Sequence, residues 1–170
     1  LHSCITAAIG TLRGPLHGVA NEAAMDLIQK FKSPDDAEKE LLGMLQRKEK
    51  IMGFGHAVYK ESDPRNNVIK NWSKKLSYEV NDKLLYPVSE RCEEVMWREK
   101  KLFCNADFFH ASAYHFMGIP TKLFTPIFVM SRISGWAAHV KEQRKNNRII
   151  RPSADYTGPD NQTFIKIEDR

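Results

Sequence analysis

Three short segments of the chain carry residues that could perform acid–base chemistry. They are Gly14-Pro15-Leu16-His17-Gly18, Gly53-Phe54-Gly55-His56 and Asn105-Ala106-Asp107-Phe108-Phe109. Each places one proton-transfer group, His17, His56 or Asp107, at or beside the expected end of a structural element. Two histidines and a carboxylate can move protons next to a carbonyl group. Together with the basic stretch Arg148-Ile149-Ile150-Arg151-Pro152, these segments predict an enzyme that handles anions.

His17 stands directly before an expected helix, and the positive end of the helix dipole disfavours its imidazolium form. A neutral imidazole can donate its N–H to a carbonyl oxygen and stabilise an enolate. Gly14 and Gly18 favour this role, because glycine permits close approach of the backbone to a ligand. The alternative is that His17 only packs against the helix or caps it.

His56 follows a Gly-Phe-Gly stretch that can leave the backbone N–H groups and the ring exposed together. The alternative is a histidine that is only solvated. Arg65 lies in the first turn of an expected helix, where the dipole disfavours a cation. A carboxylate or phosphate partner, which arginine grips with two hydrogen bonds, explains that position better.

Asp107 lies among phenylalanines in the sequence, and an apolar setting raises the pKa of a carboxyl group and makes it a stronger base. The alternative is a helix N-cap, a place that suits both Asn105 and Asp107. Arg132 interrupts an apolar helix. Its guanidinium is either extended to solvent on its aliphatic stem or paired with an anion.

The composition is that of an ordinary globular chain, with 170 residues, 42% hydrophobic and 28% charged. It favours one domain with a buried core. The net charge of +5 suggests nucleic-acid binding, but acidic and basic residues are interleaved almost everywhere. The one basic cluster, Lys141 to Arg151, is either a solvated helix end or an anion site. The sequence contains no run of 18 apolar residues, so it predicts no membrane span. We therefore expect no nucleic-acid partner and no membrane.

The cysteines and histidines show no metal-binding pattern. Cys4, Cys92 and Cys104 are odd in number and form no close pair, which is typical of a reducing compartment. His110 and His115 are five residues apart, so they do not share one helix face, and no pair of cysteines lies near them to complete a metal site. We predict no metal site.

Helical spacing and start signals predict an all-α fold that positions these groups. A buried face runs from Ala20 to Phe31, and Ser33 is expected to cap the next helix, with Pro34 in its first turn. Further helices are expected after Asp63-Pro64, with Pro87 in a first turn, and, both buried, over 103–117 and 124–140. Residues 50–60 should form a shaped loop, and Phe164–Ile167 is a candidate short strand.

Four separated motifs, in order, resemble the citrate synthase family: GPLHGVANEAAM, IMGFGHAVYKESDPR, CNADFFHASAYHFMGIPTKLFTPIFVMSRISGWAAHVKEQ and NNRIIRPSADYTGP. The resemblance covers essentially the whole chain and is greatest to the 2-methylcitrate synthase branch. It implies a citrate synthase-like all-α fold. Residues 1–13 would end a large-domain segment, about 14–118 would form the small helical domain, and 119–170 would return to the large domain as its C-terminal helices.

The resemblance implies a condensation in which an acyl-CoA is deprotonated at its α-carbon and attacks the keto group of oxaloacetate. Hydrolysis of the thioester then gives a tricarboxylate and CoA. Asp107 would be the base, His17 the donor to the thioester oxygen and His56 the donor to the oxaloacetate carbonyl. The remaining implied contacts are Arg65, Arg132 and Arg151 for carboxylates, the last across a dimer, and Lys50, Ile51, Met52, Gly53 and Phe54 along CoA.

No cofactor is implied, because the CoA thioester is a substrate. Propanoyl-CoA is the expected donor and acetyl-CoA the alternative, since a pocket discriminates one methylene by only about 1–3 kcal/mol. An alternative of another class is a non-catalytic helical module that binds CoA or dimerises. We expect a homodimer in the cytoplasm, or in the mitochondrial matrix of a eukaryote.

The chain departs from the family pattern at two positions and in length. Ala57 stands where an arginine often follows the histidine, which weakens one anion contact, and Val19 stands where glycine is usual, which crowds the helix start. Family subunits are more than twice as long, and the chain has no initiator Met and no signal-peptide layout. We interpret it as an internal or C-terminal piece, without most of the large domain and another oxaloacetate-binding histidine.

Overall fold

The computed structural model describes residues 1–14 and 18–170. That part of the chain forms helices and loops without a strand, which confirms the all-α prediction. The α-helices are α1 (His2–Leu12), α2 (Ala20–Ile28), α3 (Pro34–Gln46), α4 (Asn66–Glu79), α5 (Leu85–Lys100), α6 (Ala106–Phe116) and α7 (Phe124–Lys145). Two short 3-10 helices are η1 (Thr121–Leu123) and η2 (Ile167–Asp169).

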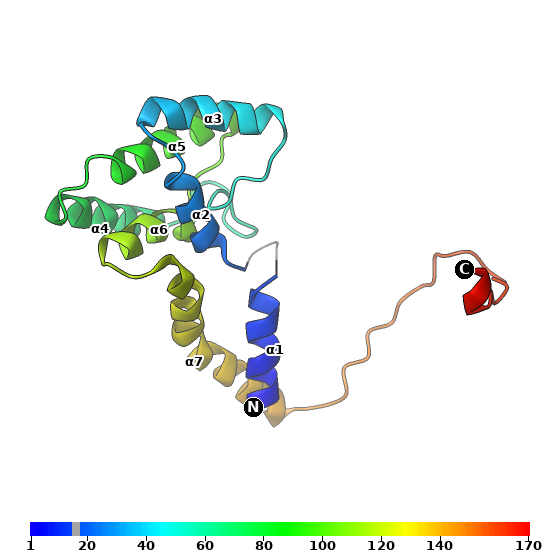
Figure 1. Ribbon diagram of the computed structural model, residues 1–170. Helices are drawn as coiled ribbons and strands as arrows, with labels where there is room; N and C mark the ends of the chain where they lie inside the picture. Colours follow the sequence, from blue (N-terminus) through cyan, green and yellow to red (C-terminus); the bar gives the residue numbers. More distant parts are fainter. Residues whose placement is uncertain (15–17) are drawn as a thin grey trace.

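The hydrophobic core lies among α2 to α6, with α6 at its centre (Figure 1). Helix α6 packs against α2 and α4, and α3 packs against α5. Phe108 and Phe109 of α6 are fully buried, as are Met25 and Ile28 of α2. Each such side chain contributes about 1.5–3 kcal/mol when it leaves water. The first turn of α6, which carries Asp107, is therefore held firmly in place.

The helix starts follow the capping signals of the sequence with one shift. The Ser33 hydroxyl accepts the Asp36 N–H at 3.1 Å, with Pro34 as the first residue of α3, as predicted. Pro87 lies in the first turn of α5. Helix α4 begins only at Asn66, because the Asp63 carbonyl oxygen accepts the Asn66 N–H in a turn that precedes the helix.

Helices α1 and α7 lie side by side outside this core (Figure 1). The expectation of a buried helix over 124–140 is wrong, since Phe124 is the one buried residue of α7, a helix that is described in full. Among the described elements α7 packs mainly on α1, and Met130 and Ile133 are exposed to solvent. No helix in the described part of the chain is long and apolar enough to cross a bilayer.

Residues 146–170 leave the end of α7 as an extended, exposed tail (Figure 1). The candidate strand at Phe164–Ile167 is not formed, and its last residue begins η2. A strand needs a neighbour that accepts its backbone hydrogen bonds, and this stretch has none in the described structure. The domain division at 13/14 and 118/119 stays a prediction.

Candidate active site

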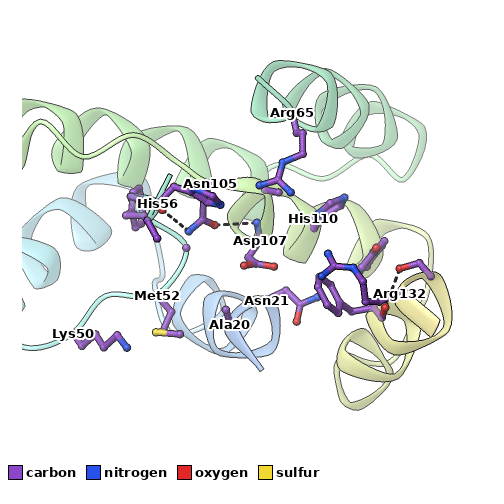
Figure 2. A pocket seen from close by; sticks show the side chains of 18 residues that line it. Ala20, Asn21, Lys50, Met52, His56, Arg65, Asn105, Asp107, His110 and Arg132 are labelled. Atoms are coloured by element: carbon purple, nitrogen blue, oxygen red, sulfur yellow. Dashed lines mark hydrogen bonds between the residues drawn. The ribbon is translucent and has the colours of Figure 1, made fainter. Parts of the chain in front are cut away.

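One cavity collects most of the residues that the sequence singled out. Its volume is 680 Å³, within the range of small-molecule sites. It lies between the loop after α3, the start of α2, the start of α6 and the middle of α7 (Figure 2). The predicted site residues that line it are His56, Arg65, Asp107, Arg132, Lys50, Met52, Gly53 and Phe54. The fold thus brings together groups that lie far apart in the sequence.

Two predicted site residues in the described part of the chain do not line this cavity. A third, His17, lies outside the described residues. Ile51 packs against the hydrophobic core instead of lining the cavity. Arg151 is exposed on the tail that follows α7 and does not line the cavity either.

The loop that carries His56 is tied to the start of α6 by backbone hydrogen bonds. The Asn105 N–H donates to the Gly53 carbonyl oxygen at 2.9 Å. The Gly55 N–H donates to the Phe103 carbonyl oxygen at 2.8 Å. The two segments therefore hold each other in register, and His56 and Asp107 are positioned by one connected piece of backbone.

Gly53 explains why this loop interrupts the helical pattern. Its φ is +94°, in the region that side-chain-bearing residues rarely adopt. A Cβ at this position would lie 2.8 Å from the Phe108 ring. The neighbouring Phe54 ring packs on Phe108 with centroids 4.6 Å apart. Glycine therefore lets the loop lie directly on the buried face of α6.

The hydrogen bonds of His56 fix which ring nitrogen can act. Its Nδ1 accepts the backbone N–H groups of Val58 at 3.0 Å and Tyr59 at 3.1 Å. The Tyr59 ring packs beside the imidazole at 4.6 Å between centroids. Because Nδ1 is an acceptor, a neutral His56 carries its proton on Nε2. That N–H can donate to a carbonyl oxygen in the cavity.

Asn105, and not Asp107, is the N-cap of α6. Its side-chain oxygen accepts the Asp107 N–H at 3.0 Å, and its amide nitrogen donates to the Gly55 carbonyl oxygen at 2.9 Å (Figure 2). Capping is thus achieved without the Asp107 side chain, which lines the cavity. The structure removes the capping alternative for this carboxylate.

The surroundings of Asp107 are less apolar than its sequence neighbours suggest. Phe108 and Phe109 point into the core, where both are fully buried. The first turn of α6 favours an ionised carboxylate through the helix dipole. The pKa of Arg65 is raised mainly by its hydrogen bonds to Asp63, and the charge of Asp107 adds a smaller effect in the same direction. A raised pKa of Asp107 stays a prediction.

Asp63 joins Arg65 to the helix that carries Asp107. Its buried carboxylate accepts hydrogen bonds from Arg65 Nε at 2.9 Å and Nη2 at 2.8 Å. It also accepts the Ala106 N–H at 3.0 Å. The Arg65 guanidinium holds the pKa of Asp63 below its usual value. Arg65 thus has an internal anionic partner, yet it is half exposed and lines the cavity, where it can meet a second anion.

Arg132 is the second arginine that lines the cavity. Its guanidinium lies over the Phe128 ring, 4.6 Å from the centroid, one turn earlier in α7. A cation over an aromatic face is held in direction without being neutralised. Arg132 reaches the cavity from α7, and Arg65 reaches it from the position directly before α4 (Figure 2). The site can therefore grip an anion with two carboxylates beside a donor histidine and a carboxylate base.

Several polar residues of the cavity were not predicted as site residues. They are Asn21, Asn105, His110, Tyr114 and Ser131. Burial lowers the pKa of His110, so its imidazole is neutral near pH 7. Its ring stacks on Tyr114 with centroids 5.2 Å apart. His110 follows Asp107 by three residues on the same helix face, and this spacing is the signal that could have found it.

Metal ligation has no support in the described residues, where no group of three His, Cys, Asp or Glu could hold a metal ion. Cys92 and Cys104 are buried in the core, and burial raises the pKa of both thiols. Both are therefore protonated at neutral pH. The absence of a metal and of a cofactor stays a prediction.

Comparison with known sequences identifies relatives over the whole chain. A 2-methylcitrate synthase from Shewanella oneidensis is 68% identical over 170 residues, which are 100% of this chain and 45% of that protein. A citrate/2-methylcitrate synthase from Bacillus subtilis is 46% identical over 164 residues, 96% of this chain and 44% of that protein. The chain thus spans under half the length of these relatives.

Solved structures show the same fold. A citrate synthase from Thermotoga maritima superposes with a TM-score of 0.85 at 37% identity, covering 100% of this chain and 47% of the other. A ternary complex of carboxymethyl coenzyme A and oxaloacetate with citrate synthase from Thermoplasma acidophilum gives a TM-score of 0.85 at 36% identity, covering 98% and 46%. The family model "Citrate synthase, C-terminal domain" matches residues 1–153. The chain belongs to the citrate synthase family.

Proposed function

We propose that the chain works within a 2-methylcitrate synthase, which condenses propanoyl-CoA, oxaloacetate and water to 2-methylcitrate and CoA. The observation that carries this proposal is the single cavity lined by His56, Asp107, Arg65 and Arg132. Identity of 68% to the Shewanella oneidensis 2-methylcitrate synthase supports propanoyl-CoA as donor. The Thermoplasma acidophilum neighbour, a complex with oxaloacetate and a CoA derivative, supports the two substrate classes.

In the proposed reaction Asp107 removes one proton from the α-carbon of the thioester. The N–H of His17 stabilises the enolate oxygen that forms. The α-carbon attacks the keto carbon of oxaloacetate, and His56 donates its Nε2 proton to the keto oxygen, which becomes a hydroxyl. Water then cleaves the thioester, so that the new carboxylate and the CoA thiol leave as products.

The anion contacts follow from the same cavity. Arg65 and Arg132 hold the carboxylates of oxaloacetate through charge-assisted hydrogen bonds. Lys50 to Phe54 lie along CoA, with Ile51 turned to the core. Arg151 lies on the exposed tail, from which we propose that it completes the site of the second subunit in a homodimer. A cytoplasmic location belongs to the same proposal.

The chain alone is expected to be a poor catalyst. It spans 45% of the length of the Shewanella oneidensis relative. We propose that the rest of a family subunit supplies most of the large domain and a further histidine for oxaloacetate. Normal turnover by the isolated 170 residues would contradict this part of the proposal.

Citrate synthesis from acetyl-CoA is the second candidate, because the structural neighbours include citrate synthases and one Bacillus subtilis relative is named for both reactions. The test is CoA release by the complete gene product with oxaloacetate and either thioester. We expect kcat/KM for propanoyl-CoA to exceed that for acetyl-CoA by at least about 10-fold, the lower end of what one methylene supplies. Binding of CoA without release of CoA from either thioester would instead indicate a non-catalytic module.

A further inference from the structure

A small recess lies beside Asp107, next to the main cavity. Its volume is 10 Å³, which is room for one group the size of a water molecule or a methyl group. Leu12 of α1 and Val19 and Ala20 at the start of α2 form one part of its wall. Thr125 and Phe128 of α7 form another part.

The recess and the main cavity share the wall at Asp107. Ala20, Asn21, Asp107 and Phe128 line both of them. Figure 2 shows the Asp107 carboxylate pointing toward the start of α2, where Ala20 and Asn21 lie. A carbon atom that gives a proton to Asp107 must lie against this carboxylate. A substituent on that carbon is therefore within reach of the recess.

Val19 has an unusual backbone conformation for its residue type. It is the N-cap of α2, with φ of 55° and ψ of 20°, in the left-handed region. A β-branched residue is a genuine outlier there, whereas glycine adopts the conformation at no steric cost. The chain thus keeps a strained residue whose side chain borders the recess. Such strain gathers where a side chain serves a ligand.

We propose that Val19 sets the length of the acyl chain that the site accepts. The recess takes the terminal methyl group of a propanoyl chain, and the isopropyl group of Val19 blocks the next carbon of a butanoyl chain. This inference rests on the proposed condensation and adds a specificity-determining residue to it. Val19 acts by shape and takes no part in proton transfer.

The α7 part of the wall offers a second, independent probe. The Thr125 hydroxyl is buried and has no hydrogen-bond partner within the described part of the chain. Thr125→Val replaces that hydroxyl by a methyl group of similar size and makes the α7 part of the wall apolar. A methyl group of the substrate should then be preferred more strongly, because one polar group fewer lines the recess. We expect the propanoyl-to-acetyl ratio of kcat/KM to rise on the order of two- to five-fold, because a methyl group no longer has to pack against a partly desolvated hydroxyl.

The test measures kcat/KM of the complete gene product for acetyl-, propanoyl- and butanoyl-CoA with oxaloacetate. Val19→Ala and Val19→Gly should each raise the butanoyl-to-propanoyl ratio at least about 10-fold. A ratio cancels any general loss of folded protein, and agreement between the two variants separates the volume of the side chain from the strain of the backbone. Val68→Ala, at an exposed position of α4, is the control and should leave the ratio unchanged.

The outcomes separate this inference from the proposed function. Unchanged ratios in both Val19 variants, with propanoyl-CoA still turned over, refute the role of Val19 and leave the condensation intact. A lower propanoyl-to-acetyl ratio in Thr125→Val shows that the recess does not hold the methyl group. If the wild-type protein releases CoA from none of the three thioesters, the proposed function itself fails, and the inference falls with it.

Discussion

Replacing Asp63 by asparagine should weaken both the fold and the grip of Arg65. The carboxylate accepts the N–H, Nε and Nη2 groups of Arg65 and the N–H of Ala106. The Arg65 Nη2 and Ala106 bonds share Oδ2, and asparagine places a donor NH2 group there if it keeps its oxygen toward the other two. Two donors then lose their acceptor.

The expected loss follows from the burial of the two donors. An unsatisfied buried donor costs about 1–3 kcal/mol, and the Ala106 N–H is buried. Arg65 is half exposed, so water replaces most of what it loses. We expect Asp63→Asn to lower the free energy of unfolding by about 2–3 kcal/mol. Because the Asp63 carboxylate no longer orients the Arg65 guanidinium, KM for oxaloacetate should rise about 10-fold or more.

The effect should depend on pH with a defined sign. The pKa of Asp63 is lowered in the folded protein by Arg65 from a reference value of 3.8. Its contribution is therefore complete above pH 3.8 and is lost as the pH falls through the lowered folded value. The stability difference between wild type and Asp63→Asn should shrink below about pH 4.

Urea unfolding of the complete gene product at neutral and acid pH gives this difference, and steady-state rates at varied oxaloacetate give KM. Asp26→Asn, at an exposed position of α2, is the matched control and should change the unfolding free energy by less than about 0.5 kcal/mol. If Asp63→Asn behaves like Asp26→Asn, or if its deficit is the same at both pH values, the reasoning about this carboxylate is wrong.

Two further predictions concern the loop that carries His56. In Gly53→Ala the new Cβ would combine a positive φ with a contact of 2.8 Å to Phe108. Thermal unfolding should therefore show a decrease of about 2–3 kcal/mol in the free energy of unfolding. A decrease of less than about 1 kcal/mol would contradict the close packing. Asn105→Ala removes the α6 cap and the bond to the Gly55 carbonyl oxygen, and should cost about 1–2 kcal/mol. Amide hydrogen exchange at Asp107 should be faster in that variant, and unchanged exchange would disprove the capping role.

Local signals in the sequence predicted much of the fold. Ser33 and Pro87 predict helix starts because N-caps and first-turn prolines act within one helical turn and do not depend on distant residues. The glycines of residues 50–60 mark a loop because they break the helical pattern. The positive φ of both glycines and the close packing of Gly53 on Phe108 became visible only in the structure.

Features that depend on distant neighbours were predicted less well. The segment 124–140 is apolar enough to be buried, but burial requires other elements around it, and α7 is accompanied mainly by α1. Arg65 was expected to need an external anion. Its internal partner, Asp63, was interpreted as a helix start, and the bond from Ala106 to Asp63 spans 43 positions, beyond any local pattern.

The most direct test of the proposed site uses propanoyl-CoA with two deuterium atoms on the α-carbon. The complete gene product and its Asp107→Asn variant are incubated with oxaloacetate, and the rate of CoA release and the mass of the product are measured. If Asp107 is the carbon base, the wild-type product retains one deuterium, and the variant loses at least about 100-fold in kcat. A variant that keeps more than half of the wild-type rate would contradict the assignment of Asp107 as the base.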